Sequence, residues 1–297
     1  MEAAEAAGAT LVRHRVHDVR RGPTVTLDGT HEARVLVGAD GAYSVVRRML
    51  GVRPGPMAVA LRGYAPTPPS RARAQVIVFD AARHQAYAWS FDRGDGLSNV
   101  GYGELLRHRH DRSTKARLLE RLDALLPGAA DGGADWRGHH LPLALARWRP
   151  PQGQVLLAGD AAGLVNPMTG EGIYYAVATG LAAGRAAAEA LGAGDPATAG
   201  SRYAAATRPL LDSHLRHIRL AARLCRHGSV INAGLRASGA EQRVFDDLVE
   251  LGLARGQITA PMARGLVREL ASAAAGRGRR HAPNDIEDIK ETRLCDC

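Results

Sequence analysis

A short acidic turn after a buried strand is the strongest chemical signal in the sequence. The apolar run Val155–Leu157 predicts a strand, and Gly159 and Asp160 follow it in a tight turn that presents one carboxylate at the strand's carboxyl end. A glycine-rich loop then leads into Ile173–Leu191, an Ala-rich segment that predicts a helix. Backbone N–H groups at a helix start attract electron-rich groups, and a carboxylate accepts hydrogen bonds from hydroxyls. A flavin meets both demands.

A second acidic turn lies more than a hundred residues earlier in the chain. Asp40 and Gly41 follow the apolar end of the segment 34–41, and a helix is expected to start directly after them. Ser44 is a candidate cap for this helix, and Arg47 and Arg48 could meet a pyrophosphate. Either turn alone could be an ordinary joint between a strand and a helix. The two together, in this order, are a more specific sign of a flavin site.

A third pattern places aromatic residues on one face of a strand. Tyr87, Trp89 and Phe91 alternate along the chain, so their side chains point to the same side of a sheet. Asn99 follows in the next predicted strand with two glycines, where the backbone must approach another group closely. Spacing alone leaves two interpretations open, an apolar face of the core or the wall of a binding pocket.

These three patterns resemble the geranylgeranyl reductase family of FAD-dependent oxidoreductases, which is related to flavoprotein aromatic hydroxylases. Residues 87–91 match a Tyr-x-Trp-x-Phe motif, and residues 99–103 match an Asn-Val-Gly-x-Gly strand. Residues 169–173 match the Thr-Gly-Glu-Gly-Ile loop of the reductases rather than the Gly-Gln-Gly loop of the hydroxylases. The chain departs from the family at Asp92, where the family has proline. The resemblance covers roughly residues 1–225.

The resemblance implies an FAD site beside a pocket for a prenyl chain. In it, Asp160 would bind a ribityl hydroxyl, and the N–H groups of residues 170–173 would lie near the pyrimidine edge of the flavin. The implied cofactor-binding residues are Asp40, Gly41, Gly159, Asp160, Pro167, Gly170, Glu171, Gly172 and Ile173. The implied substrate-binding residues are Tyr87, Trp89, Phe91 and Asn99. No catalytic side chain and no metal ligand is assigned, and NAD(P)H or another donor would supply the electrons.

The resemblance also implies a fold. We expect an α/β chain with the FAD/NAD(P)-binding, glutathione-reductase-like and hydroxylase-type fold, an inserted β-rich substrate domain and a C-terminal helical region. The expected divisions are an FAD-binding domain at 1–50 and 144–200, a substrate-binding insertion at 51–143, helices at 201–275 and a disordered tail at 276–297. No Gly-x-Gly-x-x-Gly motif follows a strand, so we expect the first βαβ unit of the FAD-binding domain to be missing.

Local patterns predict the elements around these motifs. Strands are expected at Leu11–Val19, Thr24–Leu27, Ala74–Phe79, Gln85–Phe91 and Leu97–Tyr102, with a hairpin turn at Asp28 and Gly29. A helix is expected at Arg112–Leu126, and helical periodicity continues from Ser201 to about Ala274.

The sequence assigns no chemical role to the histidines outside these motifs. His214 and His217 are placed on a solvated basic helix face, which could rest on anionic lipid, and His139 and His140 are expected in a loop.

Composition narrows the functional classes. The formal net charge is +9 and the pI is about 10.1, yet Lys115 and Lys290 are the only lysines and the arginines are scattered. Aromatic residues make up only 4% of the chain, which disfavours a nucleic-acid surface. Three cysteines form no disulfide framework, and the sequence shows no signal peptide and no apolar run of membrane-spanning length. We therefore expect a cytoplasmic protein, with peripheral membrane contact left open and the oligomeric state unassigned.

The expected function is FAD-dependent reduction of isoprenoid, geranylgeranyl-type double bonds, or a reaction on a similar long hydrophobic substrate. One alternative is an FAD-dependent monooxygenase or halogenase, although neither lysine suits the catalytic lysine of a halogenase by position. The other alternative is a truncated, flavin-free homologue without catalytic activity.

Overall fold

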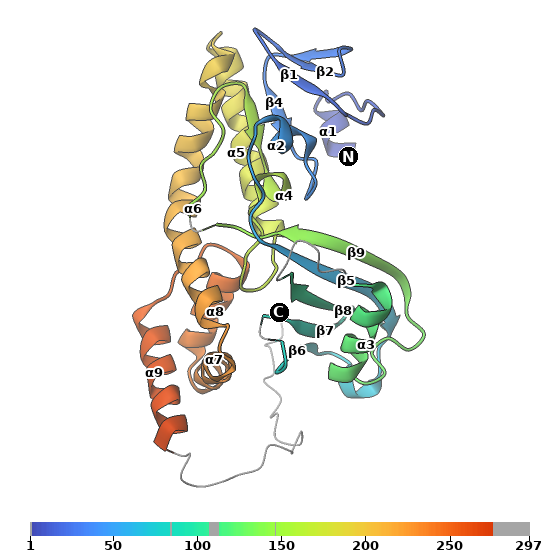
Figure 1. The fold of residues 1–297 in the computed structure, drawn as a ribbon, viewed down its shortest axis with the longest axis vertical. Coiled ribbons are helices and arrows are strands. Elements are labelled where there is room, and N and C mark those ends of the chain that lie inside the picture. Colours follow the sequence, from blue (N-terminus) through green and yellow to red (C-terminus); the bar gives the residue numbers. More distant parts are fainter. Residues whose placement is uncertain (1, 84, 107–112, 146, 276–297) are drawn as a thin grey trace.

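The computed structural model describes residues 2–83, 85–106, 113–145 and 147–275. The chain forms three β-sheets, a bundle of long helices and a group of C-terminal helices (Figure 1). The predicted tail at 276–297, which contains Cys295 and Cys297, lies outside the described residues. No described helix combines the length and the apolar character needed to cross a bilayer.

A parallel pair of strands joins the two acidic turns. β4 (Leu36–Gly38) pairs in parallel with β10 (Val155–Leu157), so Asp40 and Asp160 leave the same edge of one small sheet. All three residues of β10 are buried, as the apolar run predicts. Short helices follow each strand, α2 (Val45–Met49) after β4 and α4 (Gly159–Ala162) after β10.

An antiparallel sheet at the N-terminus covers this pair. After α1 (Glu2–Ala6), the strands β1 (Val19–Arg21), β2 (Val25–Leu27) and β3 (His31–Ala33) form a three-stranded sheet. The hairpin turn predicted after β2 is present, but the strand predicted at Leu11–Val19 is wrong, since only Val19 belongs to one. The backbone N–H groups of His17 and Asp18 bind the Asp28 carboxylate instead of a neighbouring strand.

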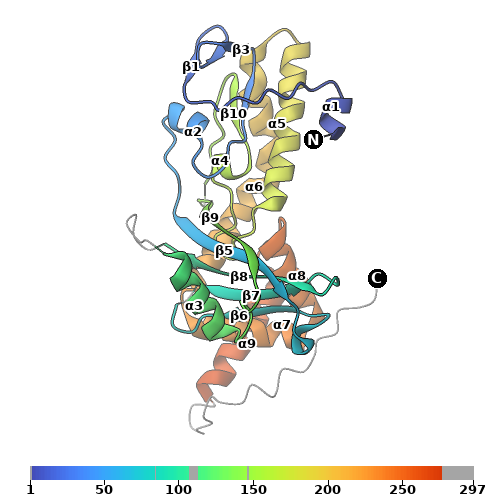
Figure 2. The same cartoon turned by 90° about the vertical axis from the view of Figure 1, so that its right-hand side faces the viewer.

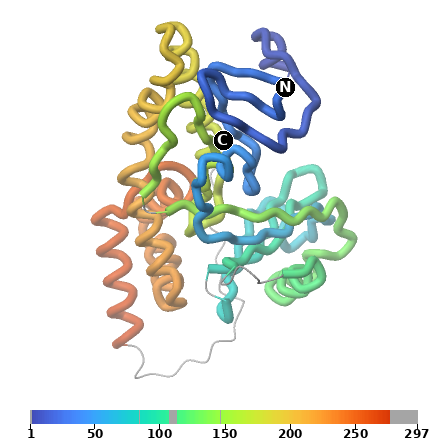
Figure 3. Tube along the Cα trace, turned by 45° about the horizontal axis from the view of Figure 1, so that its top comes forward, coloured from blue at the N-terminus to red at the C-terminus, as the bar shows by residue number. Residues whose placement is uncertain are grey.

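A five-stranded antiparallel sheet forms the second half of the molecule. Its strand order is β6–β7–β8–β5–β9. The strands are β5 (Met57–Pro66), β6 (Gln75–Phe79), β7 (Tyr87–Asp92), β8 (Leu97–Leu105) and β9 (Ala134–Pro142), with a 3₁₀ turn η1 (Pro69–Arg71) before β6. β5 and β9 run side by side across the molecule (Figure 3), and the sequence patterns predicted neither strand.

One face of this sheet packs on α3 (Lys115–Leu125), which Figure 2 shows in front of the strands. Thr114 caps the helix by accepting a hydrogen bond from the N–H of Arg117. Leu118 and Leu122 are buried against Val100 and Tyr102 of β8. This packing gives the sheet its own hydrophobic core and leaves the opposite face free for other contacts.

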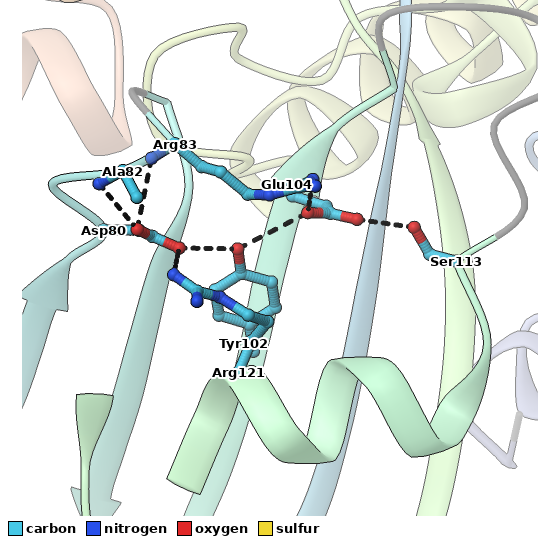
Figure 4. A network of polar contacts seen from close by, with 7 residues as sticks. All are labelled: Asp80, Ala82, Arg83, Tyr102, Glu104, Ser113 and Arg121. Carbon is cyan, nitrogen blue, oxygen red and sulfur yellow. Dashed lines mark hydrogen bonds and ion pairs between the residues drawn. The ribbon is translucent and has the colours of Figure 1, made fainter. Parts of the chain in front are cut away.

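A buried polar network ties α3 to the sheet (Figure 4). Asp80 binds Arg121 and accepts a hydrogen bond from the Tyr102 hydroxyl (3.1 Å), while Glu104 pairs with Arg83 (2.6 Å). Burial acts to raise the pKa of Asp80, but the hydrogen bonds from Arg121 and Tyr102 outweigh it and hold the pKa below its usual range. Removing one partner of such a pair costs about 3–5 kcal/mol, so the network fixes α3 in one position.

Long helices pack behind the parallel pair. The helix predicted to begin at Ile173 is confirmed as α5 (Ile173–Gly192), and a 3₁₀ turn η2 (Pro196–Thr198) leads to α6 (Ala199–Leu224). The chain continues through α7 (Gly228–Ala240), α8 (Gln242–Leu253) and α9 (Ala260–Ala275). In Figure 1 these three helices lie on the side of the five-stranded sheet opposite α3.

The predicted solvent exposure is wrong for His214, while His217 is half-buried. His214 is only 2% exposed, and His217 accepts a hydrogen bond through Nδ1 from the N–H of Ile258 (3.1 Å). The segment between α8 and α9 covers this part of α6, and this long-range packing has no signal in the sequence of α6 itself. His214 therefore does not belong to the exposed face of α6.

Candidate cofactor and substrate site

One cavity of about 1010 Å³ lies between the parallel pair and the free face of the five-stranded sheet. Its volume is at the upper end of the range usual for ligand sites. All residues that the sequence resemblance assigned to cofactor or substrate binding line this single cavity. They are Asp40, Gly41, Tyr87, Trp89, Phe91, Asn99, Gly159, Asp160, Pro167, Gly170, Glu171, Gly172 and Ile173.

The turn at Gly159 and Asp160 is held by backbone contacts from two sides. Gly159 has a φ of 55°, which favours glycine, and its N–H donates to the Thr179 hydroxyl of α5 (3.0 Å). Arg47 donates through Nη1 to the carbonyl oxygens of Asp160 and Ala161 (3.0 Å each). This buried guanidinium also binds the carbonyl of Ala42 and so links the two acidic turns to each other, while its predicted contact with a pyrophosphate stays a prediction.

The Asp160 carboxylate faces the cavity without a protein donor. No hydrogen bond to its side-chain oxygens occurs among the described residues. Burial raises the pKa of Asp160, although the charges of Arg47 and His139 act in the opposite direction. A half-buried carboxylate with free lone pairs can accept hydrogen bonds from the hydroxyl groups of a ligand.

The carboxylate of Asp40, unlike that of Asp160, is bound by backbone N–H groups of the protein. Its Oδ2 accepts hydrogen bonds from the N–H groups of Val45 (2.6 Å) and Val46 (3.3 Å), at the start of α2. Ser44 accepts from the N–H of Arg47 (2.9 Å), which confirms the predicted cap. Two side chains thus hold the start of α2, and the cap fixes Asp40 at the rim of the cavity.

The sequence suggested that the N–H groups of residues 170–173 face a ligand. In the structure, three of these four N–H groups are bound within the loop. Gly170 donates to the carbonyl of Asn166 (2.8 Å), and Glu171 donates to the Thr169 hydroxyl (3.3 Å). The N–H of Ile173 donates to Oε1 of Glu171, so this carboxylate caps α5 where glycine at position 172 supplies no side chain. The positive end of α5 is thus neutralised by Glu171 in this structure.

The C-terminal helices brace this loop. Nδ2 of Asn166, which is fully buried, donates to the carbonyls of Leu251 (3.1 Å) and Gly252 (3.0 Å) at the end of α8. The Tyr175 hydroxyl of α5 contacts Nε2 of His214 (2.6 Å), whose Nδ1 lies 2.6 Å from the carbonyl of Gly256. No local sequence pattern predicts these contacts, since the partners lie about forty or more residues apart.

Aromatic side chains line the free face of the sheet next to the loop. Tyr87 and Trp89 stand opposite glycines of β8, at 103 and 101, and Phe91 stands opposite Asn99. A Cβ at position 101 would lie 2.2 Å from the Trp89 ring, so glycine lets this ring lie flat across β8. The close approach predicted from these glycines is thus an approach to Trp89, whose Nε1 donates to Oδ1 of Asn99 (3.0 Å). We call Tyr87, Trp89 and Phe91 the aromatic strip.

Tyr87 connects the aromatic strip to the loop. Its hydroxyl donates to the carbonyl of Thr169. Burial, together with the charge of Glu171, raises the pKa of Tyr87 to about 12, so the hydroxyl keeps its proton at neutral pH. The free face of the sheet is fixed against the loop by this bond.

Several residues of the cavity wall were not predicted from the sequence. His139 and His140 were expected in a loop, but both belong to β9 and line the cavity, and His140 stacks edge-on against Tyr43 at 5.5 Å. Arg62 of β5 also lines the cavity. β9 carries mostly small and polar residues, and in β5 the residue between buried Val59 and Leu61 is small, so neither strand stands out from its sequence. Among the residues that the structure describes, no three His, Cys, Asp or Glu side chains form a metal-binding group.

Residues 3–210 match the sequence model of the FAD binding domain. The chain belongs to this FAD-binding family. Its α/β architecture agrees with the fold expected from the sequence resemblance, which is thereby confirmed.

Curated relatives of this chain are named as reductases. Digeranylgeranylglycerophospholipid reductase of Methanothrix thermoacetophila is 28% identical over 234 residues, which cover 67% of this chain and 54% of the relative. Menaquinone reductase of Mycobacterium tuberculosis is 34% identical over 208 residues, which cover 63% of this chain and 48% of the relative. The chain spans about half the length of these curated relatives.

A solved structure supports the fold. The geranylgeranyl bacteriochlorophyll reductase-like protein of Thermoplasma acidophilum superposes with a TM-score of 0.61, at 17% identity, over 86% of this chain and 68% of that protein. At this identity the similarity concerns the fold alone.

The residues of the cavity fit part of an FAD molecule. The donor-free carboxylate of Asp160 suits a hydroxylated chain, and a Cβ at position 172 would lie 3.3 Å from its Oδ1, so glycine keeps the space beside it open. The aromatic strip and Pro167 offer apolar surface for a ring system. Such a fit concerns the ribityl and ring portions, because the chain contains no Gly-x-Gly-x-x-Gly motif for a pyrophosphate.

Proposed function

We propose that this chain binds FAD in the cavity and that the FAD site reduces isoprenoid double bonds of the geranylgeranyl type. The observation that carries the proposal is the meeting of Asp160, the loop before α5 and the aromatic strip in one cavity. A polar anchor for a cofactor and an apolar wall for a long chain therefore face each other. When reduced FAD is bound, it supplies the hydride for the alkene.

The side chains of this protein have binding and positioning roles in this proposal. Asp160 accepts hydrogen bonds from ligand hydroxyls, and Arg47 holds its backbone in place. Tyr87 and Trp89 give a flat apolar surface that excludes water, and the bond from Tyr87 to the loop keeps this surface beside the cofactor site. His139 lines the cavity near Asp160 and is the first candidate for delivering a proton.

The names of the curated relatives support a prenyl substrate. One relative described above is named as a reductase of a digeranylgeranylglycerophospholipid, a lipid whose name specifies geranylgeranyl chains. We therefore propose a prenyl chain as the substrate of this protein, with NAD(P)H or another donor as the source of electrons.

Anaerobic turnover tests this function against its rivals. The purified chain is mixed with FAD, desalted and reduced with dithionite. Geranylgeranyl diphosphate is then added, and the mass of the product is measured by mass spectrometry. The proposal predicts a gain of two hydrogens per reduced bond. A monooxygenase would instead add one oxygen atom in air, and a chain that retains no flavin absorbance after desalting would support the flavin-free alternative.

Matched tryptophan variants localise the activity. Trp89→Phe alters the cavity wall, whereas Trp136→Phe alters a residue that packs against Gly63 and the core on the α3 side. We expect Trp89→Phe to raise KM for the prenyl substrate several-fold and Trp136→Phe to leave it unchanged. Equal effects of both variants would contradict the assignment of the aromatic strip to substrate binding.

A further inference from the structure

Two arginines lie over the Tyr64 ring on the free face of the five-stranded sheet, and a third stands beside one of them on the neighbouring strand. The Cζ atoms of Arg62 and Arg93 each lie 4.9 Å from the centroid of the Tyr64 ring. Arg137 of β9 is the direct cross-strand partner of Arg62. We call Arg62, Arg93 and Arg137 the arginine cluster.

Negative charge compensates only one member of the arginine cluster among the described residues. Only Arg93 forms an ion pair, with Asp95 (2.8 Å), and neither Arg62 nor Arg137 does so with any described residue. Like charges directly opposite each other on paired strands are destabilising. The Tyr64 ring offsets part of this repulsion through cation–π contact, but it supplies no negative charge. A cluster with this imbalance attracts an anion.

The position of Arg62 connects the cluster to the proposed site. Arg62 lines the same cavity as Asp160 and the aromatic strip, and it lies in one cross-strand row with Gly101 and Trp89. It stands five residues along β5 from Met57, roughly 17 Å at the usual rise of a strand. Near the Met57 end of the sheet, Leu143 forms a β-bridge with Val165, which comes just before the loop that leads to α5. The acidic residues Asp40, Asp160 and Glu171 lie at this end, so the cavity has opposite charges at its two ends.

We propose that Arg62 and Arg137 bind the phosphate group of a prenyl ester whose hydrocarbon chain lies over the aromatic strip. This proposal rests on the prenyl substrate proposed above and adds its headgroup. Guanidinium groups bind phosphate oxygens in pairs of charge-assisted hydrogen bonds, and stacking on Tyr64 orients one guanidinium of the cluster. The site thereby selects phosphorylated prenyl compounds over neutral ones such as quinones and alcohols.

A pair of ligands that differ only in the headgroup tests the proposal. Binding of geranylgeranyl diphosphate and of geranylgeraniol is measured by tryptophan fluorescence, with FAD present, for the wild type and for Arg62→Gln/Arg137→Gln. We expect the double variant to bind the diphosphate at least about tenfold more weakly, with the affinity for the alcohol unchanged. Arg20→Gln, which changes an exposed arginine of β1, is the control and should bind as the wild type does.

The outcomes separate this proposal from the proposed function. Equal losses for both ligands, an unchanged diphosphate affinity, or no diphosphate binding by the wild type would each overturn the headgroup site. Arg62→Lys keeps the charge and should bind the diphosphate more tightly than the double glutamine variant does. A folding defect would not give this partial recovery. Arginine-dependent binding without reduced product would reject the reductase function and leave the headgroup site standing.

Competition then identifies the source of the phosphate. A prenyl-chain phospholipid in detergent micelles and geranylgeranyl diphosphate are each tested for the ability to displace the other from the arginine cluster. Stronger competition by the phospholipid assigns a lipid headgroup, and stronger competition by the diphosphate assigns a free prenyl ester. Failure of both to compete would contradict a phosphate site.

Discussion

Burial raises the pKa of Asp160, and the nearby charges of Arg47 and His139 offset this effect only in part. A carboxylate whose pKa is raised by folding destabilises the folded protein once the pH passes above that pKa, since ionisation is easier in the unfolded chain. This direction is opposite to that of a salt-bridged aspartate. The residue that would hold the cofactor therefore lowers the stability of the protein without ligand at neutral pH.

Asp160→Asn tests this balance. At pH 7 to 8 we expect the variant without ligand to melt at a higher temperature than the wild type, because no charge remains to be buried, while FAD binds more weakly by about 1–2 kcal/mol. Thermal melts across pH and an FAD titration measure the two effects. Asp195→Asn, at an exposed position before η2, is the control. A lower melting temperature of Asp160→Asn at pH 8 would contradict the direction of the shift.

At the scale of elements, the aromatic strip depends on the glycine opposite Trp89. A methyl group at position 101 would overlap the ring, whereas a Cβ at position 103 would meet its nearest neighbours at 3.6 to 3.8 Å, an ordinary contact. The two glycines of β8 therefore differ in their tolerance of a side chain.

Gly101→Ala and Gly103→Ala form a matched pair on one strand. We expect Gly101→Ala to lower the free energy of unfolding by about 1–3 kcal/mol and to shift the tryptophan emission, because Trp89 must leave its place. Gly103→Ala should change both by much less. Urea titrations followed by fluorescence measure this difference, and similar losses in both variants would show that the ring of Trp89 does not restrict position 101.

The elements that the sequence predicted are those with strong local patterns. The segments that became α3 and α5 have long uninterrupted helical runs, and β10 is an unbroken apolar run. β5 alternates buried Val59 and Leu61 with residues such as Ala60 and Arg62, and β9 contains no β-branched residue, so neither strand stood out. A five-stranded sheet therefore had only three predicted strands.

In the candidate site, too, the residues that could be predicted are those with a local sequence pattern. Asp160 and the aromatic strip could be assigned because the side chains follow turns or alternate within one strand. His139 and Arg62 could not, since their place in the cavity depends on which strand pairs with which. Glu171 could be assigned to the loop, but its role as a helix cap depends on a side-chain rotamer that no sequence pattern specifies.

At the scale of the whole molecule, the C-terminal helices are coupled to the loop before α5 through buried polar groups. Burial lowers the pKa of His214, and the charge of His217 adds to this effect, while the hydrogen bond to Gly256 opposes it. The neutral ring donates through Nδ1 to Gly256 and accepts through Nε2 from Tyr175. Protonation would place a second donor against the Tyr175 hydroxyl.

His214→Gln tests the pH dependence of this coupling. A histidine whose pKa is lowered by folding stabilises the protein above its unfolded pKa, about 6.5, and this stability is lost as the pH falls below that value. The wild type should therefore lose melting temperature between about pH 7 and pH 5, and His214→Gln should flatten the curve. His227→Gln, at an exposed position before α7, should keep the wild-type curve. A wild-type curve in His214→Gln would assign the pH dependence to other groups.

The five-stranded sheet begins and ends at neighbouring positions. Met57 at the start of β5 is the cross-strand partner of Pro142 at the end of β9, so the two ends of this segment lie within about 5.5 Å of each other. A segment with adjoining ends can be exchanged for another without stretching the rest of the chain, and the loop-closure cost of such an exchange is small. Residues 57–142 can therefore be replaced as one segment without displacing the parallel pair and its acidic turns.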